Sequence, residues 1–182
     1  MTTRRRIRVW LVLFLVGLVA SGVTAFPLEH EVHWLRSVLD RFDAAPGALV
    51  TWIERVDQGI TETNDRHPFI MYGTDWLAFA HLVIAVAFWG PLRDPVRNVW
   101  VIEFGMIACV GVVPLALFAG PVRGIPGWWT VLDISFGVFG VVPLLIVRRL
   151  IKRLEREEAL GARPDDNQLA PEKALPSLGG RG

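Results

Sequence analysis

Four long apolar segments alternate with polar stretches along the chain. They cover residues 9–26, 73–91, 96–119 and 128–147. A helix needs about 20 apolar residues to cross the hydrocarbon core of a bilayer, so each segment predicts one membrane-spanning helix. The last three segments follow each other closely, which predicts short antiparallel connections between them.

The stretch between the first two apolar segments, residues 27–72, has a different pattern. Apolar side chains recur there every three to four positions, with charged residues between them. One series is Leu28, Val32, Leu35, Leu39 and Phe42, and the other is Leu49, Val50, Ile53, Val56 and Ile60. This spacing is typical of amphipathic helices. We expect two short helices that lie on the membrane surface or cap the bundle, with Trp34 and Trp52 at the interface.

The composition agrees with a small membrane protein. Hydrophobic residues make up 52% of the 182 residues, and the net charge of +1 does not favour a nucleic-acid partner. The predicted fold class is all-α: a polytopic membrane protein with four transmembrane helices and two amphipathic helices in an extracytoplasmic loop. We expect the fourth helix to extend over residues 148–160, and the polar residues 161–182 to form a disordered tail.

Basic residues predict the orientation, because loops on the cytoplasmic side are enriched in Lys and Arg. Residues 1–8 form a basic start, and further basic residues flank the other predicted cytoplasmic ends. The whole set is Arg4, Arg5, Arg6, Arg8, Arg93, Arg97, Arg148, Arg149, Lys152, Arg153 and Arg156. The chain is therefore predicted to be a multi-pass protein of the cytoplasmic (plasma) membrane, with both termini in the cytoplasm and residues 27–72 outside.

The first apolar segment has a second interpretation. The start "MTTRRRIRVWLVLFLVGLVASGVTAF" combines a basic end, an apolar run and small residues at Val23 and Ala25. These are also the features of a cleavable signal peptide. We favour a retained helix, because the apolar run is long for a signal core.

Burying a charged side chain within the membrane costs free energy, so each ionisable residue predicted there needs a partner or a functional role. Asp75 lies near the outer end of the second span and also fits a helix-start acid. Asp133 enters the fourth span from the same side, and Arg123 lies in the loop above. These three residues are predicted to form an outer polar cluster. Gly137 and Gly140 share the face of Asp133, which predicts close packing against another helix.

His81 and Glu103 are the ionisable residues predicted deepest in the membrane. His81 lies near the midplane, whereas Glu103 enters on the third span from the side of Asp94 and Arg97. Their estimated depths differ by about 7 Å at the helical rise per residue, so a pair between the two helices is geometrically plausible. Such a pair either holds the bundle together or carries a proton, and the sequence leaves both roles open.

We predict no cofactor. In "LEHEVH", His30 and His33 are weak metal candidates, since their obvious third ligand is the distant His67. His81 has no second histidine at a similar depth to complete a haem site. The single cysteine, Cys109, excludes an intramolecular disulfide.

Three functional hypotheses follow from the sequence. The first is an accessory or scaffold subunit of a membrane assembly, with no enzymatic activity. The second is a small proton-coupled transporter or binder that uses Asp75, His81, Glu103 and Asp133 as a polar ladder. The third is a membrane-embedded enzyme linked to lipid or quinone. The expected partners are the lipid bilayer and other membrane subunits or a second copy of the chain.

Overall fold

The computed structural model describes residues 2–42 and 45–161, and within these residues all regular elements are helices. The elements are α1 (Thr3–Ala25), α2 (Leu28–Leu39), α3 (Gly47–Arg66), α4 (Pro68–Ala87), α5 (Trp89–Arg93), α6 (Val99–Val122) and α7 (Gly127–Gly161). Apart from Gly161, the predicted tail 161–182 lies outside the described residues.

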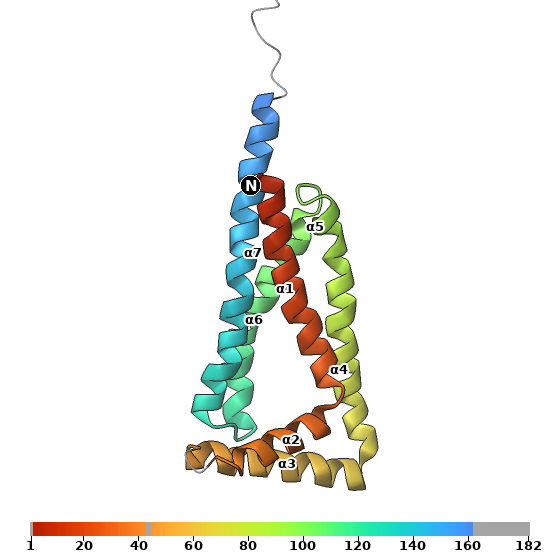
Figure 1. Cartoon of the computed structure of the whole chain (residues 1–182), viewed down its shortest axis with the longest axis vertical. Helices are drawn as coiled ribbons and strands as arrows, with labels where there is room; N and C mark the ends of the chain where they lie inside the picture. Colours follow the sequence, from red (N-terminus) through yellow and green to blue (C-terminus); the bar gives the residue numbers. More distant parts are fainter. Residues whose placement is uncertain (1, 43–44, 162–182) are drawn as a thin grey trace, which may run out of the picture.

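The helices form a tall frame with an apex and a base (Figure 1). The apex is the end where α1 begins, where α5 lies and beyond which α7 projects; the base consists of α2 and α3. Helix α4 forms one side, and α6 with α7 forms the other. Helix α1 runs between the two sides and packs against both α7 and α4.

Four helical segments are long and apolar enough to cross a membrane, by length and composition. They are Thr3–Ala25, Pro68–Arg93, Val99–Val122 and Gly127–Leu160. The four predicted apolar segments all fall within or largely within them. The second helix begins at Pro68 rather than residue 73, because proline suits the first turn of a helix, where its missing N–H is not needed.

The buried core lies near the apex. Ile7 and Leu11 of α1, Ile102 of α6 and Leu144 of α7 are fully buried together with Phe88, which joins α4 to α5. The ring centroids of Phe14 and Phe88 lie 4.9 Å apart. Toward the base the two sides separate, since α4 packs there against α1 and α3. The frame is therefore tight at the apex and wider at the base.

Helices α6 and α7 make the most extensive contact in the fold, and glycine allows it. A Cβ atom at Gly137 would lie 2.5 Å from the backbone oxygen of Cys109, and one at Gly140 would lie 2.8 Å from its Sγ. The expected close packing of the Gly137 and Gly140 face is confirmed, and its partner is α6.

Helix α1 is part of the core, which bears on the signal-peptide interpretation. It supplies Ile7 and Leu11 to the buried cluster, and Gly22 contacts α4 at His81. Removing residues 1–25 would expose Phe88 and leave α4 without its main neighbour. We expect intact-mass analysis of the mature protein to find α1 present, and a chain that starts at Phe26 would contradict this.

Candidate functional site

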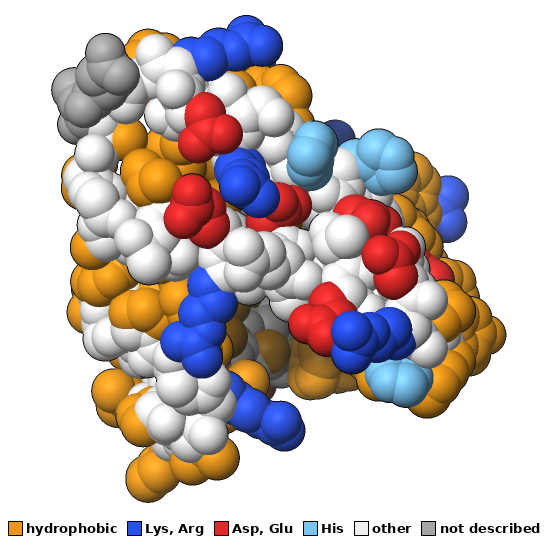
Figure 2. All heavy atoms as spheres, turned by 90° about the horizontal axis from the view of Figure 1, so that it is seen from below, with side chains coloured by type: hydrophobic (Ala, Val, Ile, Leu, Met, Phe, Trp, Pro, Cys, Tyr) orange, Lys and Arg blue, Asp and Glu red, His pale blue; other side chains and the backbone are white. Residues whose placement is uncertain are grey.

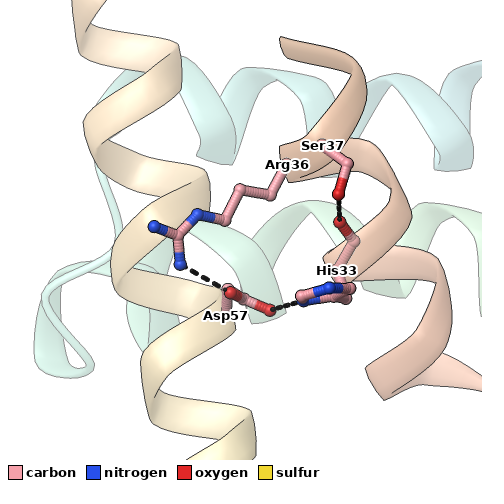
Figure 3. A network of polar contacts seen from close by, with 4 residues as sticks. All are labelled: His33, Arg36, Ser37 and Asp57. Atoms are coloured by element: carbon pink, nitrogen blue, oxygen red, sulfur yellow. Dashed lines mark hydrogen bonds and ion pairs between the residues drawn. The ribbon is translucent and has the colours of Figure 1, made fainter. Parts of the chain in front are cut away.

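The one polar network built on a buried acid in the described residues lies in the base, between α2 and α3. Asp57 of α3 is only 5% exposed, and its Oδ2 accepts a hydrogen bond of 2.9 Å from Nη1 of Arg36 on α2 (Figure 3). Nδ1 of His33 lies 3.7 Å from the other carboxylate oxygen. Ser37 donates to the backbone oxygen of His33, one turn back along α2. A buried carboxylate requires such a partner, because desolvation of an unpaired charge is costly.

The ion pair acts on Arg36 as well. The hydrogen bond to the Asp57 carboxylate raises the pKa of Arg36, so its guanidinium stays charged. His33 and Arg36 are three residues apart, about one helical turn, and so both face Asp57 of α3. The network thus joins the two helices through side chains that the helical repeat places on one face.

A second polar contact joins the helices near their other ends. Nδ2 of Asn64 on α3 donates to Oε2 of Glu29 on α2, at 2.8 Å. Trp52 of α3 packs against Trp129 of α7, with ring centroids 6.0 Å apart. We call α2 and α3, joined in this way, the base platform. It contacts α4 at one end through α3 and reaches α7 through Trp52.

The outward face of the base platform is mixed in charge. Seen from below, acidic, basic and histidine side chains alternate over this face, with hydrophobic side chains at its margins (Figure 2). No single sign of charge dominates the view. Such a surface suits solvent contact and polar partners better than a highly charged polymer.

The predicted outer cluster of Asp75, Asp133 and Arg123 does not form. Asp75 lies on α4, whereas Asp133 lies on α7 on the opposite side of the frame. Within the described residues, no hydrogen bond or ion pair joins any two of the three. Helix α1 runs between the two sides, and this arrangement separates Asp75 of α4 from Asp133 of α7 and from Arg123 at the end of α6.

The expected pair of His81 and Glu103 is also absent, because each has another partner. Nδ1 of His81 lies 2.8 Å from the backbone oxygen of Leu77 in its own helix. Oε1 of Glu103 accepts from Nε and Nη2 of Arg148 on α7, at 2.9 and 2.8 Å. Helix α6 packs on α7 rather than on α4, so Glu103 meets Arg148 of α7 instead of His81. In the sequence, Arg148 was used only to predict the orientation in the membrane.

Asp94 and Arg97 form a local turn between α5 and α6. The backbone N–H of Arg97 donates to Oδ1 of Asp94 at 3.1 Å, and Asn98 donates its side-chain amide to the backbone oxygens of Asp94 and Gly90. These contacts close the connection at the apex. Asp94 and Arg97 therefore have a structural role in this turn.

The two weak metal candidates point to different places. His33 faces Asp57, and His30 lines a cavity at the corner of α2 and α4. In the part of the chain that the structure describes, no group of three or more His, Cys, Asp or Glu residues is placed to hold a metal ion.

This cavity, the corner pocket, is defined by residues of α2, α3, α4 and the connection after α1. It has a volume of about 420 Å³. The polar side chains that line it include Glu29, His30, Asn64, Tyr72 and Asp75. Asp75 lines this cavity, which it shares with the base platform. The prediction that Asp75 is a helix-start acid is wrong, because α4 begins at Pro68 and has no acid in its first turn.

Sequence reasoning missed Asp57 and Arg36, although one signal was present. Asp57 lies four residues after Ile53 and three before Ile60, so a carboxylate stands in the apolar stripe of α3. An acid in an apolar stripe needs a partner from another helix.

Comparison of the chain with protein-family models, curated proteins and solved structures gives no match.

Proposed function

We propose that this chain is an integral membrane protein that acts as an accessory or scaffold subunit of a membrane assembly, without a reaction of its own. In this proposal, α1, α4 with α5, α6 and α7 cross the cytoplasmic membrane. The apex faces the cytoplasm, since the N-terminal arginines, those around α5 and the basic residues in the last part of α7 gather at that end. The base platform then lies outside.

The observation that carries the proposal is the ion pair between the buried Asp57 and the partly exposed Arg36 in the base platform. Buried ion pairs add little net stability, but they favour one arrangement of the helices that carry them. Here the pair holds together a platform that contacts α4 on one side of the frame and α7 on the other. A frame of defined width, with a polar outer surface, is suited to position other membrane subunits.

The transporter alternative receives less support from the geometry. Its proposed ladder requires Asp75, His81, Glu103 and Asp133 to follow one another through the membrane. No hydrogen bond or ion pair joins any two of these four described residues; His81 instead contacts the backbone of its own helix, and Glu103 is paired with Arg148. The enzyme alternative also receives little support, because the most buried acid of the base, Asp57, is paired with Arg36 and Glu29 accepts from Asn64.

The test is native mass spectrometry of the protein after mild extraction from its own host. We expect discrete added masses from other polypeptides, and the same added masses with Glu103→Gln, because Glu103 serves a helix contact in this proposal. A bare monomer or homodimer would contradict it. Flux measurements in liposomes on the Glu103→Gln variant would then decide whether the chain is an autonomous carrier.

A further inference from the structure

The corner pocket lies where four parts of the chain meet. Phe26 and Pro27 come from the connection between α1 and α2, and Glu29 from the first turn of α2. Asn64 comes from the end of α3, and Asp75 from the first half of α4. At about 420 Å³, the cavity falls in the size range of small-molecule sites. Its position at the end of an apolar helix places it beside the membrane surface.

The charge of the pocket is one-sided. Two carboxylates, Glu29 and Asp75, line it, and the described residues of the lining include no lysine or arginine. Asn64 donates to Oε2 of Glu29 and so orients that carboxylate, while Oε1 makes no hydrogen bond within residues 2–42 and 45–161. Asp75 forms no side-chain hydrogen bond or ion pair with any described residue. Both groups are therefore available to a cation from outside the chain.

The remaining lining of the pocket is mainly apolar and aromatic, with His30 and Thr74 as its further polar side chains. Phe26, Leu28, Met71 and Tyr72 contribute to it, and the Tyr72 ring packs edge-on against Trp76 at 6.0 Å. Aromatic rings attract cations through their faces, and carboxylates form strong charge-assisted hydrogen bonds with ammonium groups. An anion would be repelled by Glu29 and Asp75, and a metal ion would lack a third ligand.

We propose that the corner pocket binds an organic amine, with its ammonium group between Glu29 and Asp75 and its carbon framework against Phe26, Leu28 and Tyr72. The amine can come from a free small molecule or from the headgroup of a lipid at the membrane surface. The shared chemistry is a primary ammonium on a short carbon framework.

The experiment uses the purified full chain in detergent and two probes. One is n-butylamine, followed by calorimetric titration, and the other is an ethanolamine-headgroup phospholipid, followed by native mass spectrometry beside a glycerol-headgroup lipid with the same acyl chains. Two variants are compared with the wild type. Asp75→Asn removes a pocket charge without breaking an intramolecular contact. The control, Asp65→Asn, removes the same charge from α3 outside the pocket lining.

We expect saturable binding to the wild type and unchanged affinity in Asp65→Asn. In Asp75→Asn the affinity should fall about tenfold, because one charge-assisted hydrogen bond to the ammonium group is lost. Binding of both probes identifies a general amine site. Binding of the ethanolamine lipid alone, in preference to the glycerol lipid, identifies the lipid headgroup as the source of the amine. Equal affinity in the two variants, or no binding of either probe, would overturn the proposal.

Discussion

Replacing Gly137 with alanine is expected to destabilise the α6–α7 contact by about 3 kcal/mol, because overpacking is costly where the neighbour cannot move aside. A Cβ at this position would lie 2.5 Å from the backbone oxygen of Cys109 and 3.3 Å from Cβ of Val112. A backbone oxygen within a helix has no rotamer to change. The two helices would have to separate along their most extensive contact.

Gly111→Ala is the matched control for this prediction. Gly111 lies on α6, and a Cβ there would meet nothing within 4 Å. Alanine at that position should leave stability unchanged or raise it by up to about 1 kcal/mol, the difference in helix propensity. Reversible unfolding in mixed detergent and sodium dodecyl sulfate micelles, followed by circular dichroism, measures both variants. Equal stabilities for the two would contradict the packing argument.

Asp57→Ala is expected to loosen the base platform by about 2 kcal/mol, because it leaves the Arg36 guanidinium without its hydrogen-bonded partner. The Asp57 side chain is 8% exposed and that of Arg36 is 35% exposed, so water compensates only part of the loss. The effect should be local to α2 and α3. Hydrogen exchange of their backbone amides, compared with those of α6 and α7, measures it.

A second acid on the same helix provides the control. Glu62 pairs with Arg66 one turn away, and both side chains are more than half exposed. Exposed pairs of this kind contribute at most about 0.5 kcal/mol, so Glu62→Ala should leave the exchange of α2 unchanged. Replacing both Arg36 and Asp57 with methionine and leucine should restore much of the protection lost in Asp57→Ala, since no unpaired charge remains. Equal exchange in the Asp57→Ala and Glu62→Ala variants would show that burial of Asp57 has no special role.

The helices themselves were predictable from the chain. Four apolar segments specify four long helices, because a continuous apolar run of that length is stable as a helix away from water. The three-to-four-residue spacing after residue 27 predicted the amphipathic pattern of α2 and α3. Even the close approach at Gly137 and Gly140 was visible as a small-residue face, although its partner was not.

The partners of the polar residues were decided by the tertiary structure. The sequence predicted Glu103 opposite His81 and Asp75 beside Asp133, but Glu103 pairs with Arg148, and Asp75 faces the corner pocket. The physical reason is that helix formation depends on local properties, namely the apolar content of a segment and the spacing of its apolar residues. Which residues become neighbours depends instead on which faces of two helices pack against each other. Helix α6 is apolar on all sides, so its sequence does not specify a contact face. The buried charge of Asp57 is balanced only because α2 folds back along α3 and brings Arg36 to it.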